Sequence, residues 1–97
     1  MLDRQLIIEK LKYLKPILKR QYGLSEIALF GSYARDTQTP ESDIDLMVSY
    51  DDANYKNFLH TIDALEATFP GIPVQAIIRG AIKPHYFDSI KGDLIYA

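Results

Sequence analysis

The most informative part of this sequence is Gly31-Ser32-Tyr33-Ala34-Arg35, followed after a polar loop by Ser42-Asp43-Ile44-Asp45-Leu46. The largely apolar run from Glu26 to Phe30 before the glycine predicts a buried strand. Carboxylates alternate with aliphatic side chains at the start of the stretch from Asp43 to Ser49, which predicts a second strand. Two strands therefore frame a glycine-serine turn and a pair of aspartates.

The residue types in this stretch suit phosphate and metal binding. Residues i and i+2 of a strand point to the same side about 6.6 Å apart, so Asp43 and Asp45 project their carboxylates together. Two converging carboxylates suit Mg²⁺, which prefers oxygen ligands and often binds substrate phosphates as well. Gly31 permits close backbone approach, and Ser32 opens a helical turn whose free N–H groups bind a phosphate oxygen. The stretch therefore predicts a nucleotide site.

Each of these features also has an ordinary structural explanation. A glycine and a serine after a strand usually form only a turn, and an Asp-x-Asp pattern often marks a solvated strand face. The combination favours a functional site, because a buried strand precedes the turn and the aliphatic Ile44 and Leu46 interleave with the aspartates.

In this order, the two motifs resemble the signature of the minimal nucleotidyltransferases (MNT) of the DNA polymerase beta superfamily. The resemblance extends over most of the chain, because the Lys-Pro helix near the N-terminus, the strand that ends in Phe30-Gly31 and the segment from Lys83-Pro84 to Tyr96 also match. It implies an α/β nucleotidyltransferase fold: a small mixed sheet with helices packed mainly on one face. The glycine-serine turn and the aspartates are then expected at an exposed edge.

The resemblance also implies a role for each matching residue. Ser32 and Gly31 hold the triphosphate of ATP, and Asp43 and Asp45 are the catalytic residues that bind Mg²⁺ for attack of a hydroxyl on the α-phosphorus. Arg35 is a further candidate for nucleotide binding, because it lies three residues after Ser32 on the same helical face. An ion pair between Arg35 and an acidic neighbour is the alternative.

Two positions depart from the family pattern. Asp36 stands where the family usually has glycine, and aspartate tolerates a left-handed backbone better than most residues. Gln75 stands where active members commonly carry a third carboxylate, and its neutral amide cannot accept a proton. Asp88 and Asp93 lie in the C-terminal helix-and-turn region, and nothing in their spacing places them at the site.

Composition excludes several classes of function. Eleven Lys and Arg residues against 13 Asp and Glu give a formal net charge of −2, without the basic excess that favours nucleic acids or anionic membranes. The absence of cysteine excludes a disulfide scaffold, a thiolate zinc site and a cysteine nucleophile, and suits a reducing cytosol. No signal peptide or membrane-spanning run is visible, so we expect a cytoplasmic protein.

The rest of the chain predicts helices and two further strands. Apolar residues at helical spacing predict an N-terminal helix, after which Pro16 is expected to begin a second short helix and Gly23 to form a left-handed cap. A length of 97 residues predicts a single domain over residues 1–97. The pattern further predicts a core-facing helix through Phe58, Ile62, Leu65 and Phe69. A strand is expected from Pro73 to Ile78. After it we expect a short helix from about Lys83-Pro84 and an edge strand from Leu94 to Tyr96.

The resemblance implies a partner protein. Small members of the family commonly appear as antitoxins paired with a HEPN ribonuclease toxin, and some transfer AMP from ATP to a tyrosine of the toxin. Because 97 residues leave no space for an acceptor-binding domain, we expect a partner or a second chain to present the acceptor. The protein is then expected to form a homo- or hetero-oligomer. The alternative is a catalytically weakened module that neutralises its partner by contact, which Gln75 favours. Transfer to an antibiotic or a nucleic-acid end is disfavoured, because the chain has neither a substrate domain nor a basic groove.

Overall fold

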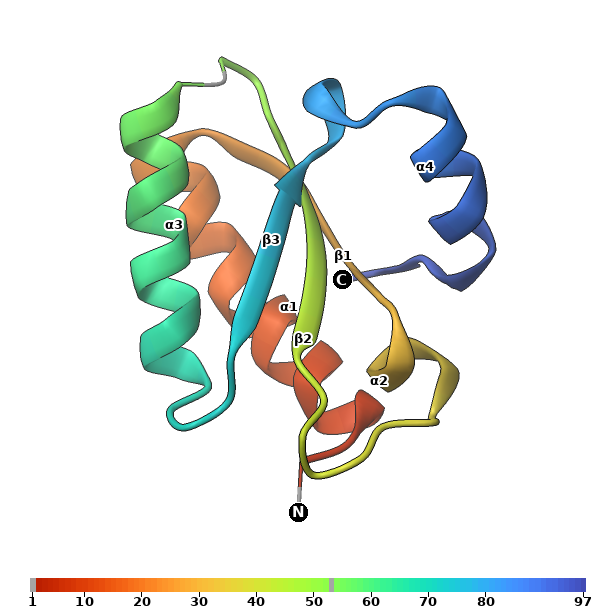
Figure 1. The fold of residues 1–97 in the computed structure, drawn as a ribbon. Coiled ribbons are helices and arrows are strands. Elements are labelled where there is room, and N and C mark those ends of the chain that lie inside the picture. Colours follow the sequence, from red (N-terminus) through yellow and green to blue (C-terminus); the bar gives the residue numbers. More distant parts are fainter. Residues whose placement is uncertain (1, 53) are drawn as a thin grey trace.

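The computed structural model describes residues 2–52 and 54–97. One mixed sheet has the strand order β3-β2-β1-β4 (Figure 1). The central strands β1 (Leu24–Phe30) and β2 (Ile44–Tyr50) pair antiparallel. On the outer sides, β3 (Val74–Ile78) runs parallel to β2, and β4 (Ile95–Tyr96) pairs antiparallel with β1. The mixed sheet expected from the sequence is confirmed.

The helices lie on both faces of this sheet, with the two long ones together. Figure 1 shows α1 (Arg4–Tyr22) and α3 (Tyr55–Thr68) on one side of the strands and α4 (Pro84–Ile90) on the other. A single helical turn, α2 (Ser32–Arg35), follows β1. Two 3-10 turns, η1 (Arg79–Ala81) and η2 (Lys91–Asp93), flank α4. Within the described residues, no helix is long and apolar enough to cross a bilayer.

Two hydrophobic clusters follow from the alternation of side chains along the strands. The larger cluster joins the sheet to α1 and α3 and contains from the strands Leu24, Ile27, Leu29, Ile44, Leu46 and Val48. The smaller cluster joins the opposite face to α4 and contains Ala28, Phe30, Met47 and Ile90. Because Asp45 is two residues from Met47, it lies on the α4 face, outside the larger core.

The expected second helix at Pro16 is wrong, because α1 is continuous through this residue. Proline removes only one intrahelical hydrogen bond, and Pro16 lies on the exposed side of the helix. The buried residues Ile7, Leu11 and Leu18, on both sides of Pro16, pack into one cluster and keep the two halves in line. Gly23 ends the helix with φ 73°, as the sequence predicts.

The topology also fixes where the motif residues lie. They lie where β1 ends and β2 begins, which are the two central strands, and not on an outer strand. The reason is that α3 crosses over and returns the chain as β3 beside β2, which leaves β2 inside the sheet. Asp45 of β2 therefore has a neighbouring strand on each side.

Candidate functional site

The site is built around Gly31, where β1 turns into α2. Its backbone has φ 78° and ψ −156°, a combination that only glycine adopts readily. A Cβ atom built on Gly31 would overlap Oδ2 of Asp45 and lie 3.1 Å from the Cγ atom of that side chain. The Asp45 carboxylate thus lies directly against the Gly31 backbone, with Phe30 and Asp45 in register across the two strands.

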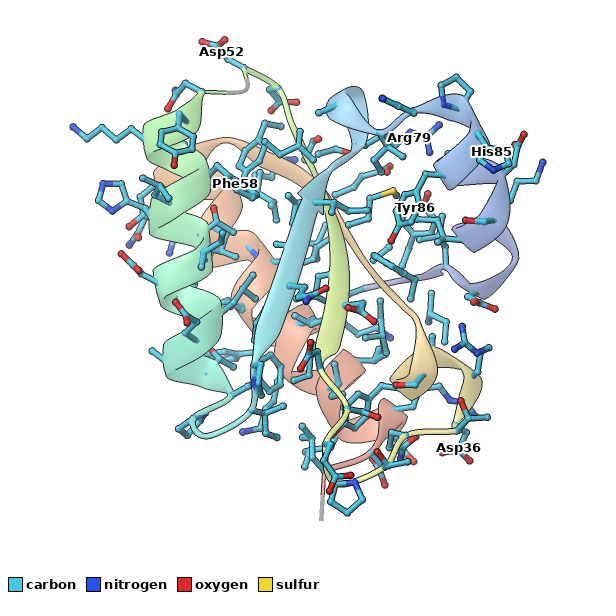
Figure 2. All side chains as sticks on the ribbon, viewed as in Figure 1. Asp36, Asp52, Phe58, Arg79, His85 and Tyr86 are labelled. Atoms are coloured by element: carbon cyan, nitrogen blue, oxygen red, sulfur yellow. The ribbon has the colours of Figure 1, made fainter. Side chains whose placement is uncertain are left out.

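The turn that follows presents Ser32 and Arg35 while its other side enters the core. Tyr33 and Ala34 are buried, whereas Ser32 is half-buried and Arg35 is exposed. Asp36 closes the turn in the left-handed conformation, with φ 61°, and its N–H donates to the Ser32 and Tyr33 carbonyls. Asp36 therefore adopts the left-handed backbone that aspartate tolerates better than most residues. Figure 2 shows Asp36 at the α2 end of the molecule.

Asp43 and Asp45 come together at the beginning of β2, as the sequence predicts. Burial raises the pKa of the Asp45 carboxyl, the nearby Asp43 carboxylate raises it further, and the Arg35 guanidinium opposes both effects. The two carboxylates therefore repel each other in a partly desolvated place. Their oxygens are donors that suit Mg²⁺, and a cation between them would relieve the repulsion.

Gln75 lies beside this pair. It is the register partner of Asp45 in the parallel pairing of β3 with β2, so both side chains lie on the same face. Gln75 is also exposed. Within residues 2–52 and 54–97, no group of three or more His, Cys, Asp or Glu side chains is arranged to hold a metal. The two carboxylates thus have a neutral amide as their neighbour on β3.

Arg35 has an acidic partner that sequence reasoning did not place at the site. Its Nη1 atom lies 2.7 Å from Oδ2 of Asp93, on η2. The two residues are 58 positions apart, so no local spacing indicates the pair. Asp88, the other aspartate of the C-terminal helix-and-turn region, pairs at 3.2 Å with Lys91 instead.

An apolar groove of about 510 Å³ lies away from these residues, over the end of β3. Figure 2 shows two of its lining residues, Phe58 of α3 and Tyr86 of α4, on opposite sides of that strand. Neither aspartate lines it, and neither does Ser32. The candidate site is therefore an open surface beside the sheet edge and not this groove.

Replacement of Gly31 by alanine should destabilise the protein and displace Asp45. We expect a loss of about 2–4 kcal/mol, because backbone strain and steric overlap add. Gly71→Ala is the matched control: its φ is also positive, at 83°, but a Cβ there meets nothing within 4 Å. That control should lose only about 1–2 kcal/mol in urea unfolding. Equal losses for the two variants would contradict the close contact.

Asp45→Asn should stabilise the metal-free protein at neutral pH. Because the pKa of Asp45 is raised, its contribution to stability is present below the ordinary value of 3.8 and is lost as the pH rises through the folded-state value. The thermal midpoint of Asp45→Asn should exceed that of the parent at pH 7, by roughly 4–8 °C for each kcal/mol gained. The difference should shrink below pH 4, and a constant difference across this range would argue against the titration of Asp45.

Comparison with known proteins identifies the family of this chain. Residues 11–97 match the model of the nucleotidyltransferase domain family. A relative from Methanocaldococcus jannaschii, provisionally named a protein adenylyltransferase, is 48% identical over 94 residues, which cover 93% of each chain.

Two solved structures share the fold. One, provisionally described as a minimal nucleotidyltransferase, has a TM-score of 0.79 at 21% identity and is matched over 97% of this chain and 95% of its own. The other is a chain from the Shewanella oneidensis complex of a tri-AMPylated HEPN toxin with its MNT antitoxin. It has a TM-score of 0.68 at 19% identity, with 96% of this chain and 70% of that chain covered. The chain therefore belongs to the nucleotidyltransferase domain family.

Proposed function

We propose that this chain is a protein adenylyltransferase and the antitoxin of a HEPN-type toxin, and that it transfers AMP from Mg-ATP to a tyrosine hydroxyl of that toxin. The observation that carries the proposal is the placement of the Asp45 carboxylate, with Asp43 beside it, against the Gly31-Ser32 turn. The name of the 48% identical relative supports the activity. The shared fold with the complex that contains an AMPylated HEPN toxin supports the partner.

The donor set fits a divalent cation. Asp43 and Asp45 are two hard oxygen ligands, and burial together with the nearby Asp43 carboxylate raises the pKa of Asp45. Positive charge between the two carboxylates would relieve their repulsion. Asp43 and Asp45 would hold Mg²⁺, which when bound neutralises phosphate charge and polarises the α-phosphate. Ser32 and the N–H groups of its turn bind triphosphate oxygens, and Gly31 lets the phosphates approach the backbone.

The transfer itself is a displacement at phosphorus. The tyrosine oxygen forms a bond to the α-phosphorus while the bond to the bridging oxygen breaks, so AMP remains on the tyrosine and pyrophosphate leaves. The phenolic proton passes to water, because Gln75, which occupies the neighbouring position on β3, cannot accept it. The contribution of this chain is therefore to orient the reacting groups and to balance the charge of the phosphates.

A second candidate function is neutralisation of the partner by contact alone. The register of Gln75 with Asp45 favours it, because a neutral amide replaces a metal ligand and proton acceptor. The same nucleotide-binding surface would then regulate or stabilise the complex without chemistry.

Incubation of the purified chain and its HEPN partner with Mg²⁺ and each nucleoside triphosphate separates the two functions. Intact mass should show AMP added to the toxin, and Asp43→Asn and Asp45→Asn should abolish the addition because they remove the metal ligands. Asp52→Asn is a suitable control, because Asp52 lies at the opposite end of the molecule from α2 (Figure 2). Inhibition of the toxin without any gain in its mass would support the contact module and overturn the transferase.

Gln75→Asp should raise the transfer rate. A carboxylate beside Asp45 adds a metal ligand and a proton acceptor, and a general base contributes about 10²–10⁴-fold. The variant should also be less stable without metal, because three like charges repel, and its thermal midpoint should depend more on Mg²⁺. Gln75→Asn is the neutral control. If Gln75→Asp changes neither the rate nor the metal dependence, Gln75 does not limit transfer.

A further inference from the structure

The Arg35–Asp93 ion pair joins the phosphate side of the site to the C-terminal part of the chain. The Nη1–Oδ2 distance of 2.7 Å is that of a charge-assisted hydrogen bond. Asp93 is well covered, with 26% of its side chain exposed, whereas Arg35 is 50% exposed. The more buried carboxylate therefore anchors the more exposed guanidinium.

This pair has little value as a source of stability. Partly exposed ion pairs contribute about 0–1 kcal/mol, because solvent screens them and long side chains lose entropy. The placement of Arg35 is more informative. It shares the single turn of α2 with Ser32, and its charge acts on the nearby Asp45 carboxyl, whose pKa burial and Asp43 raise and Arg35 lowers. Arg35 thus contacts Asp93 directly and is near enough to Asp45 for its charge to act on that carboxyl.

The contact with Asp93 leaves most of the guanidinium available. Arginine carries five N–H donors in a rigid planar fork, and this hydrogen bond uses one of them, on Nη1. A side chain that is already held in place loses less rotamer entropy when it binds a second anion. An arginine fixed by one carboxylate is therefore well suited to bind phosphate oxygens with its remaining donors.

We propose that Asp93 is a positioning residue that holds Arg35 beside Ser32, so that Arg35 binds the triphosphate of the incoming nucleotide. The inference rests on the proposed function, because it concerns the same nucleotide site. It assigns Asp93 a role in ATP affinity through Arg35 and not as a ligand of metal. Since Arg35 would contact only the phosphates, Asp93 should affect the binding of ATP and leave the binding of adenosine unchanged.

Calorimetry with Mg²⁺ and a non-hydrolysable ATP analogue, compared with adenosine, tests this role. Asp93→Asn should weaken binding of the analogue by about 3–10-fold, in line with loss of a hydrogen bond to a charged group. Adenosine affinity should stay within about twofold. Asp93→Glu should restore part of the affinity, and Asp93→Asn should have no further effect in an Arg35→Ala background.

Asp88→Asn is the matched control, because Asp88 also pairs with a basic side chain near the C-terminus, at 3.2 Å from Lys91, and is 65% exposed. It should bind both ligands like the parent. If the parent prefers the ATP analogue and Asp93→Asn binds it equally well or more tightly, the positioning role is overturned while the proposed function stands. Equal weakening of both ligands by Asp93→Asn would also overturn it, as a structural effect. A parent that does not prefer the analogue over adenosine overturns the proposed function, and this inference with it.

Discussion

The close approach of the Asp45 carboxylate to the Gly31 backbone is the constraint on which the rest of the site depends. It requires a residue without Cβ at the end of β1 and a strand register that brings Phe30 opposite Asp45. It also requires a tight turn immediately afterwards, because α2 begins at Ser32. The antiparallel pairing of the two central strands thus sets the phosphate-binding turn and the carboxylate pair in one place.

One face of the sheet forms the larger hydrophobic core, and the other face carries Asp45 of the candidate site. On the face covered by α1 and α3, the β2 residues Ile44, Leu46 and Val48 are fully buried and anchor the strand. On the other face, the smaller cluster under α4 leaves the first part of β2 partly accessible, and Asp45 lies there. Repulsion between carboxylates can be tolerated at this position because the strand that carries them is held by its opposite face.

Local patterns in the sequence were sufficient to predict the motif and most of the elements. Asp-x-Asp on a strand has only one arrangement of its carboxylates, and Gly31 and Gly23 mark backbone positions with few alternatives. The continuity of α1 through Pro16 was missed, because packing against the sheet outweighs one lost hydrogen bond. The partner of Arg35 could not be predicted either, since Asp93 reaches it only through the tertiary fold. The roles of the site residues and the single-domain organisation stay predictions.

The position of β4 has a consequence for the order in which the site forms. This two-residue strand pairs with Ala28 and Leu29, far back in the chain, and Asp93 lies just before it. Contacts between residues distant in sequence close long loops and tend to form late in folding. Pairing of β1 with β2 alone brings Asp45 to the glycine turn, whereas the Arg35–Asp93 ion pair also requires the C-terminal segment. Docking of the C-terminal strand would then be the step that brings Asp93 to Arg35 and fixes the guanidinium beside Ser32.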